Sequence, residues 1–480
     1  MKRNILLLAF ILIVMAAIVF VLPALVKDVF SNTISAQARR AVIQTFTIIV
    51  VCVSGIVYFS SGAHKREESG MWVTAITLSV FCLTGIGLIW YMVSRSSSNE
   101  NSPAYYHIIT PSSVSGVCEK IDLSALDSQP SKGNPINVRF IDAKADVDCL
   151  MNEQSDLASH MKGEAPIYIP TGVFIQSLKF DSANDVILTG FVWQRYANDV
   201  PAEIERGFVI PEGDSEIFVR EDTAVYKKQQ GNETLYGWYI NISLRQVFDY
   251  SHYPFDRQDI WLRLWHLNFD RNVILVPDFS AYHLESVWPQ DGKTFPGIER
   301  DFVLERLSLE RTYFSYHYNH YNTNFGIDSY DAHTVFPELY FNVGVRRDVL
   351  DAFVAYMIPM FILILMSFGV QFIVTQDPEK MTMHGISTTG LIAYYASLFF
   401  IGILAQLDIR RTLNAPGVVY IEYFYFVLYI ILLLQTVNSV VFAASDRVEW
   451  LEYKDNLIPK VVFFPVTLGL MYLITAFLFY

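Results

Sequence analysis

Hydroxyl and small side chains are concentrated in one long stretch without acidic or basic residues, Met381–Leu407. Residues three or four positions apart share one face of a helix. One face of a helix here would carry, in order, Thr382, Ile386, Thr389, Ala393 and either Ala396 or Ser397. Such a stripe can line a path for ions, although small residues also let helices pack closely in lipid. A register shifted by one residue would put Met383, Ser387 and Gly390 on that face instead.

An acidic residue, Glu379, comes just before this stretch. If identical chains formed a ring, their Glu379 carboxylates would attract cations and repel anions at one mouth of the pore. The neighbouring Lys380 works against that preference. By itself the stretch favours close helix packing, but with Glu379 before it and four consecutive spans after a strand-rich region, the sequence favours a pore that conducts inorganic cations.

Aromatic side chains suggest a ligand site in the middle of the chain. The segment Tyr313–Tyr330 is dense in tyrosine. Aromatic faces attract amines through cation–π contacts. The predicted ligand-binding residues are Trp193, Tyr196, Tyr313, Tyr316, Tyr318 and Tyr321. A tyrosine-rich hairpin can equally be a packing cluster, and the two interpretations have similar weight.

Protons are a second possible ligand, because imidazole titrates near neutral pH. The histidines considered for this role are His252, His266, His317, His320 and His333. The sequence contains no Ser/His/Asp order, phosphate-binding loop or metal motif. We therefore expect neither an enzyme nor a cofactor or metal site.

Apolar stretches of membrane length dominate the rest of the sequence, in which 52% of residues are hydrophobic. Roughly 20 apolar residues span a bilayer as a helix. The seven candidate spans are Asn4–Val26, Ala41–Ala63, Met71–Ser94, Ala352–Gln376, Met381–Leu407, Tyr423–Ser445 and Val461–Tyr480. These spans predict an integral membrane protein in contact with lipid.

The first span is too long for the apolar part of a cleaved signal peptide, so we expect it to be retained as an anchor. This places the N-terminus in the cytoplasm, residues 95–351 outside it, and the chain in the plasma (inner) membrane. The net charge of −13 argues against nucleic acid as a partner. Cys118 and Cys149 lie in the outer region and could form a disulfide there.

Short runs of β-branched and aromatic residues, separated by turn clusters, fill the region from Ala165 to Arg347. Such spacing predicts an antiparallel β-sandwich. The expected domains are 1–95 (three helices), 96–163 (a linker or small element with one apolar alternation at Ile136–Ile141), 164–347 (the sandwich) and 348–480 (four helices).

Three features in this order resemble the pentameric ligand-gated ion channels, the family that includes the Cys-loop receptors. Tyr253-Pro254-Phe255-Asp256 forms a turn between two strands, Arg346-Arg347 ends the last strand, and Ile358-Pro359 follows in the next helix. The match covers about Ile167 to Tyr480. It implies a homopentamer in which a small molecule binds the outer domain and opens a pore lined by the second helix of the four.

The resemblance also implies a coupling interface between the outer domain and the helices. Its predicted residues are Asp181, Tyr253, Pro254, Phe255, Asp256, Arg346, Arg347, Arg410 and Arg411. Asp256 with Arg346 or Arg347 is the expected ion pair. Unrelated surface charge is the alternative, and exposed pairs contribute only about 0–1 kcal/mol each.

The chain departs from the family plan in three ways, one of which is that the family's early Trp-x-Pro signature is not evident, since Trp288-Pro289 falls too late in the chain. Phe248–Trp265 contains no cysteine, as in bacterial members, and three N-terminal spans precede the outer domain. These spans either form an accessory bundle around the pore helices or only anchor the chain. A nonconducting membrane sensor that signals through a partner protein is the second functional interpretation.

Overall fold

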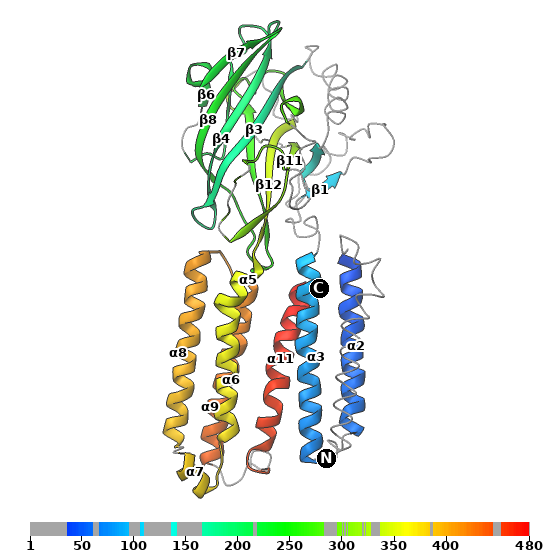
Figure 1. The fold of residues 1–480 in the computed structure, drawn as a ribbon, viewed down its shortest axis with the longest axis vertical. Coiled ribbons are helices and arrows are strands. Elements are labelled where there is room, and N and C mark those ends of the chain that lie inside the picture. Colours follow the sequence, from blue (N-terminus) through cyan, green and yellow to red (C-terminus); the bar gives the residue numbers. More distant parts are fainter. Residues whose placement is uncertain are drawn as a thin grey trace. The chain divides into compact units, whose positions relative to one another are not determined.

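A computed structural model describes residues 36–60, 67–95, 106–109, 136–141, 166–214, 218–282, 295–299, 301, 304, 306–318, 321, 323–327, 337–384, 387–444 and 453–479. Strands and helices belong to two compact units (Figure 1). One unit contains the β-strands. The other contains the helices together with the short loop Tyr250–Asp256, which interrupts the β-unit in sequence.

The β-unit consists of two sheets. The seven-stranded sheet has the order β1 (Tyr106–Ile109), β2 (Ile136–Ile141), β11 (Leu307–Tyr318), β12 (Pro337–Arg347), β9 (Arg257–His266), β5 (Gly207–Val209) and β6 (Phe218–Arg220). The five-stranded sheet has the order β10 (Val273–Pro277), β3 (Ile167–Phe180), β4 (Asp185–Ala197), β8 (Glu233–Arg245) and β7 (Tyr226–Gln230). The alternation at Ile136–Ile141 is thus a strand, paired with β11.

Alternating side chains explain why these segments pair as half-buried strands. Along β4 and β9, every second residue is buried and the residues between them are partly exposed. This is the period of a strand with one face on a core. Most strand pairs are antiparallel, as expected, but β10 pairs with β3 in parallel and β1 pairs with β2 in parallel.

The core of the β-unit lies between the two sheets. Phe208 of β5 packs edge-on against Trp238 of β8, with ring centroids 5.4 Å apart. The Tyr316 hydroxyl on β11 donates to the Leu275 carbonyl on β10 at 2.6 Å. The Tyr316 hydroxyl is therefore satisfied by the opposite sheet, and the two sheets are packed face to face.

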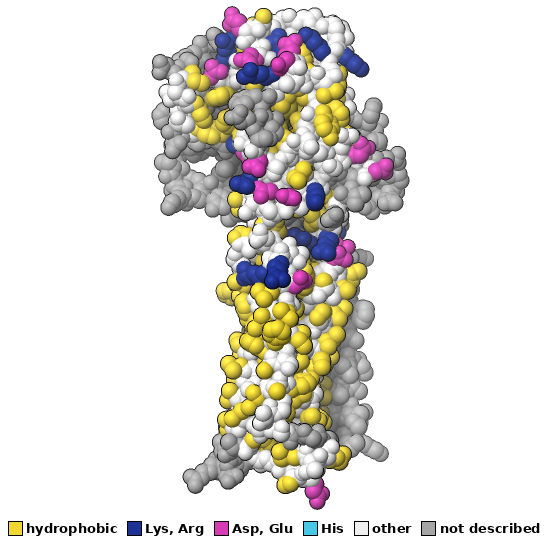
Figure 2. Space-filling view, turned by 90° about the vertical axis from the view of Figure 1, so that its left-hand side faces the viewer, with side chains coloured by type: hydrophobic (Ala, Val, Ile, Leu, Met, Phe, Trp, Pro, Cys, Tyr) yellow, Lys and Arg dark blue, Asp and Glu magenta, His cyan; other side chains and the backbone are white. Residues whose placement is uncertain are grey.

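Six described helices are long and apolar enough to cross a membrane. They are α2 (Ala36–Ser60), α3 (Glu68–Arg95), α6 (Ile358–Ile373, with the preceding turns from Val349), α8 (Thr388–Leu413), α9 (Tyr420–Ala444) and α11 (Leu457–Phe479). Hydrophobic side chains cover the helices on the face shown in Figure 2. The expected first span, Asn4–Val26, lies outside the described residues, as do Cys118 and Cys149.

The first of the four C-terminal helices is irregular near its start. The short helix α5 (Val349–Ala352) continues through a π-helical turn, Phe353–Met357, into α6. Pro359 lacks a backbone N–H and its ring opposes the carbonyl four residues earlier. A widened turn in front of Pro359 accommodates both effects.

The predicted helix Met381–Leu407 is wrong in its boundaries, because two helices cover this stretch. A short helix, α7, spans Pro378–His384, and α8 begins at Thr388. Ser387 is the N-cap of α8, since its hydroxyl accepts a hydrogen bond from the Gly390 N–H at 3.0 Å. A serine cap satisfies one of the free N–H groups at a helix start, and this stabilises the break.

The N-terminal helices α2 and α3 pack against α11. Phe46 of α2 contacts the rings of Phe81 on α3 and Tyr472 on α11, at centroid distances of 6.5 and 6.3 Å. The hydroxyls of Thr47 and Tyr472 share a hydrogen bond of 2.7 Å. A methyl group on Gly85 of α3 would lie 2.5 Å from the Tyr472 ring, so glycine permits this close approach.

Candidate functional site

The loop Tyr250–Asp256 connects β8 to β9 and is tied at its base. The Gln246 side chain donates to the Trp261 carbonyl and accepts from the Trp261 N–H at 3.2 Å. Within the loop, the Phe255 N–H donates to the His252 carbonyl at 2.8 Å. The Tyr253–Pro254 peptide is cis. These bonds hold the loop in one compact turn.

The predicted loop residue Phe255 is packed among membrane helices. It is buried, and its ring centroid lies 5.8 Å from Trp90 of α3, 6.2 Å from Tyr420 of α9 and 5.8 Å from Phe479 of α11. A direct backbone bond adds to this contact, because the Tyr420 N–H donates to the Ser251 carbonyl at 2.9 Å. A movement of the loop would therefore change the packing of Phe255 against α3, α9 and α11.

Tyr253 extends the same junction toward the first of the four C-terminal helices. It is buried, and its ring lies 6.5 Å from Tyr356 in the π-helical turn before α6. The Tyr356 carbonyl accepts a hydrogen bond from the Tyr425 hydroxyl of α9 at 2.9 Å. We call Tyr253, Phe255, Trp90, Tyr356, Tyr420 and Phe479 the aromatic junction.

Sequence reasoning named only Tyr253 and Phe255 of the aromatic junction, and Trp90 is the member that it missed on the N-terminal helices. Its indole N–H donates to the Tyr420 hydroxyl at 2.8 Å, and this hydroxyl shares a 2.7 Å hydrogen bond with Thr475 of α11. The indole ring also contacts Phe353 and Phe424. Trp90 thus links α3 to α9 and, through Tyr420, to α11.

The predicted charged coupling residues fall into different settings. Asp256 is buried and belongs to the helical unit, whereas Arg346 and Arg347 end β12 in the β-unit. Their pairing stays a prediction. Asp181 is an exposed residue of the β3–β4 turn, where its N–H donates to the Asp185 carbonyl at 3.0 Å.

Arg410 and its neighbour Arg411 differ sharply. Arg410 lies 2.6 Å from the carboxylate of Glu422, which is 1% exposed, and also donates to the Gly417 carbonyl at 2.7 Å. The same carboxylate accepts from Gln406 at 3.1 Å. Arg411 is exposed. Arg410 therefore closes the turn between α8 and α9, and Arg411 is available at the surface.

The predicted pore stripe lies on the exposed side of α8. The buried residues of this helix are Leu391, Tyr395, Leu398, Gly402, Ile409 and Leu413, which form one narrow face toward its neighbours. Thr389, Ala393 and Ser397 are exposed, and at 3.6 residues per turn Thr389 and Ala393 lie directly opposite the buried face. Ile386 lies outside the described residues.

The other two predicted pore residues belong to the short helix α7. Glu379 and Thr382 are both exposed. The Thr382 hydroxyl donates to the Pro378 carbonyl at 2.8 Å, so it is satisfied within its own helix. The Glu379 N–H donates to the Asp377 carboxylate at 3.1 Å, which caps α7. A charge on this short helix sits just before the start of α8 in the chain.

An ionic cluster lies on the outer face of the seven-stranded sheet. Arg263 of β9 pairs with Glu212 and, at 3.2 Å, with Glu338 of β12. Tyr321 donates to Glu338 and accepts from Arg263 at 3.1 Å. Burial raises the pKa of the Glu212 carboxyl, and the Arg263 charge opposes that rise.

Aromatic rings surround the ionic cluster on one side. The Trp265 ring lies 5.2 Å from the Arg263 guanidinium and contacts the rings of Phe269, Tyr321 and Phe325. Phe325 is 40% exposed. The indole N–H of Trp265 is buried and has no hydrogen-bond partner among the described residues. We call Arg263, Glu212, Glu338, Trp265, Phe269, Tyr321 and Phe325 the outer cluster.

Of the predicted ligand-binding residues, only Tyr321 belongs to the outer cluster. Tyr196 and Tyr316 are buried in the core, where the Tyr196 hydroxyl donates to Gln194 at 2.7 Å. The Trp193 indole donates to Asp278 at 2.9 Å. Tyr313 lies under the Arg311 guanidinium, 4.8 Å from its ring centroid. The side chain of Tyr318 lies outside the described part of the chain.

Two of the histidines considered as proton sensors are buried. Desolvation, with the positive charge of Arg206, lowers the pKa of His266 to about 3. Desolvation and Arg263 likewise lower the pKa of His317 to about 3, and its ring stacks on Tyr340 at 3.7 Å. Both imidazoles are therefore neutral at physiological pH. His320 and His333 lie outside the described residues.

Searches with the sequence find no matching family model and no similar curated protein. Within the described residues, no group of three or more histidine, cysteine, aspartate or glutamate side chains could hold a metal ion. The functional assignment therefore depends on the geometry of α8, the aromatic junction and the outer cluster.

Proposed function

We propose that the protein is a ligand-gated ion channel that works as a homopentamer and conducts cations. The exposure of α8 is the observation that carries this proposal. Only 17% of its apolar stretch is buried, and Thr389, Ala393 and Ser397 face outward. A single helix cannot enclose water, but a ring of identical helices can, and hydroxyl and small side chains suit such a path.

The outer cluster supports binding of an amine as the activating ligand. The carboxylates of Glu212 and Glu338 lie with the Arg263 guanidinium beside the partly exposed ring of Trp265, which in turn contacts Phe269 and Phe325. A cation over an aromatic face gains about 0.5–2 kcal/mol, more when water is excluded. An amine would also find Glu338 within the same cluster.

The aromatic junction supports transmission from the outer cluster to the helices. The outer cluster includes Arg263 and Trp265 of β9, and β9 begins at the residue after Asp256. The loop that ends at Asp256 contacts α3, α9 and α11 through Phe255. A shift of β9 on ligand binding would therefore displace the loop and change how Phe255 packs against these helices.

Reconstitution into liposomes tests the proposal. Purified protein should have the native mass of a pentamer, and tetramethylammonium or a primary amine applied outside should start sodium flux. Trp265→Ala should lower amine potency at least tenfold by removing the central ring, whereas Tyr239→Ala, at an exposed ring of β8, should not.

A monomer or dimer in native mass measurements would contradict the channel proposal. A pentamer that binds amines at the outer cluster but passes no ions under a salt gradient would instead indicate a nonconducting receptor that signals through a partner protein. Protease access to the β-unit from outside intact cells would test the proposed plasma-membrane orientation.

A further inference from the structure

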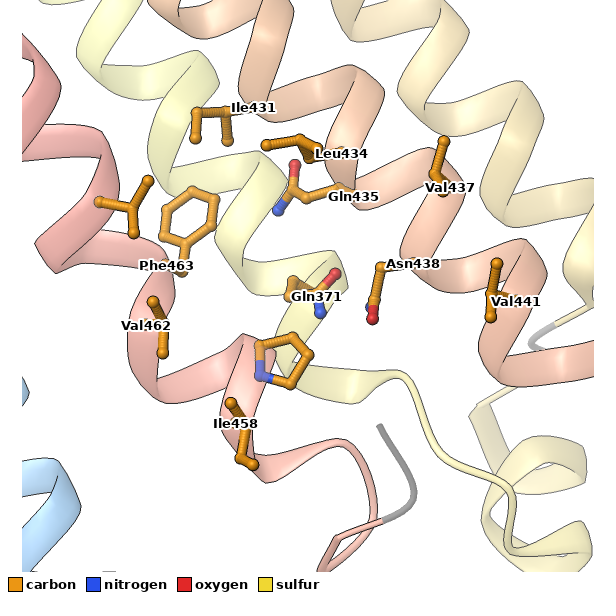
Figure 3. Close-up of a pocket in the computed structure, with 12 residues that line it drawn as sticks. Gln371, Ile431, Leu434, Gln435, Val437, Asn438, Val441, Ile458, Val462 and Phe463 are labelled. Carbon is orange, nitrogen blue, oxygen red and sulfur yellow. The ribbon is translucent and has the colours of Figure 1, made fainter. Parts of the chain in front are cut away.

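A pocket of about 480 Å³ opens between α6, α9 and α11, near the end of the bundle where α6 ends and α11 begins (Figure 3). Its rim is apolar and exposed, with Leu434 and Val437 on α9 and Val462 on α11. In a membrane, exposed apolar side chains of a helix bundle contact lipid. The pocket is therefore entered from the bilayer and not from water.

Three amide side chains lie inside the otherwise apolar pocket. Gln371 of α6 and Gln435 and Asn438 of α9 lie together among the apolar lining residues (Figure 3). Gln435 is 5% exposed, and its side-chain N–H donates to the Ser367 carbonyl at 3.1 Å. Its side-chain oxygen, and both polar atoms of Asn438, are buried with no hydrogen-bond partner among the described residues.

Unpartnered amide groups inside a membrane protein are costly, because hydrocarbon cannot replace the lost hydrogen bonds. Gln435 still needs a donor, and Asn438 needs both a donor and an acceptor. One hydroxyl group can accept from the Asn438 side-chain N–H and donate to one of the two amide oxygens. None of the twelve residues that line the pocket is charged, and a charged group without a counter-ion would be strongly disfavoured here.

We propose that this pocket binds an uncharged single-chain amphiphile with a hydroxyl head, taken up from the bilayer. The hydroxyl hydrogen-bonds with Asn438 and Gln435, and the chain lies against Phe463, Val462 and the other apolar residues. The pocket volume falls within the usual range for one small ligand. This proposal does not depend on ion conduction, because every residue involved belongs to the membrane helices themselves.

Photolabelling in phosphatidylcholine nanodiscs tests the proposal, with hexadecanol that carries a mid-chain diazirine as the probe. Labelled peptides should come from α9 and α11 at the pocket. Unlabelled hexadecanol should compete for this labelling at least tenfold better than hexadecane, which lacks the hydroxyl. Equal competition by hexadecane would overturn the proposal, because it would mean that only apolar partitioning is measured.

Two matched variants separate the pocket from the general lipid surface. Val462→Trp fills the rim and should reduce labelling at least tenfold, whereas Leu473→Trp, at an exposed position of the same helix away from the pocket, should leave it unchanged. Asn438→Leu keeps the branched shape and the number of side-chain heavy atoms, and should remove the preference for hexadecanol while the thermal midpoint stays equal or rises. Labelling that persists in Val462→Trp, or a hydroxyl preference that persists in Asn438→Leu, would contradict the assignment.

Discussion

Helices α3 and α8 of the membrane unit differ in how much of their surface is buried. Half of the apolar stretch of α3 is buried, whereas only 17% of that of α8 is buried. Yet α3 lies in the N-terminal region, which was expected either to pack around the pore helices or only to anchor the chain, and α8 is the helix rich in hydroxyl and small side chains. The N-terminal helices α2 and α3 are thus part of the packed bundle. Among the six described membrane helices, α8 has the smallest buried share.

This difference separates two roles that hydropathy alone does not distinguish. A helix that buries one side and presents large rings to its neighbours, as α3 does with Trp90 and Phe81, contributes to stability. A helix that exposes Thr389, Ala393 and Ser397 leaves that face for other chains or for water. Substitutions on α8 should therefore change transport, and substitutions on the buried face of α3 should change stability.

The largest effect is expected from Ala393→Trp on the exposed face of α8. A ring of bulky side chains would close a narrow pore, so ion flux should fall by about a hundredfold or more. The thermal midpoint should change little, because Ala393 is exposed. Leu365→Trp, at an exposed position of α6, is the control. Normal flux through Ala393→Trp would remove this face of α8 from the conduction path.

A loss of stability is expected from Trp90→Ala on α3. The Trp90 ring is partly buried, so its removal should cost less than the value of about 3–5 kcal/mol for a fully buried large ring. Trp90→Phe keeps a ring but loses the bond to Tyr420, and should cost about 1 kcal/mol. The thermal midpoint of the purified protein reports both, and exposed Leu83→Ala on the same helix is the control. If Trp90→Ala were as mild as Leu83→Ala, α3 would be only an anchor.

A smaller effect is expected at the turn between α8 and α9. Glu422→Gln would leave Arg410 without its buried carboxylate, at a cost of about 1–3 kcal/mol. Arg411→Gln, one residue along and exposed, should change stability by less than about 0.5 kcal/mol. Thermal melts of the two variants compare Arg410, which pairs with a buried carboxylate, with Arg411, which is exposed. Equal melts would mean that the Arg410 pair does not hold the end of α8.

The smallest effect is expected from Glu379→Gln on α7. Loss of one carboxylate per chain should weaken the preference for cations and shift the reversal potential under a salt gradient by a few millivolts to tens of millivolts. Exposed Glu205→Gln in the β-unit provides a charge-matched control. A reversal potential identical to that of the unaltered protein would show that Glu379 does not contribute to ion selectivity.

Local sequence patterns predicted much of the fold, because they depend on nearest-neighbour chemistry. The short run of β-branched and aromatic residues at Val186–Tyr196 predicted β4, and apolar length predicted five of the described membrane helices close to their observed bounds. The break between α7 and α8 was missed, since a serine cap inside an apolar stretch resembles any other small residue of a membrane helix.

Contacts between distant segments needed the tertiary structure. Trp90 lies 165 positions before Phe255, and Trp265 lies well away from Phe325 in the chain, so no local pattern relates them. By itself, the sequence determined that this is a membrane protein with a strand-rich region, because span length and alternation are properties of single segments. Only the tertiary structure decided which tyrosines are core and which surround Arg263, and which helix keeps an open face, because burial depends on what the rest of the chain places beside each residue.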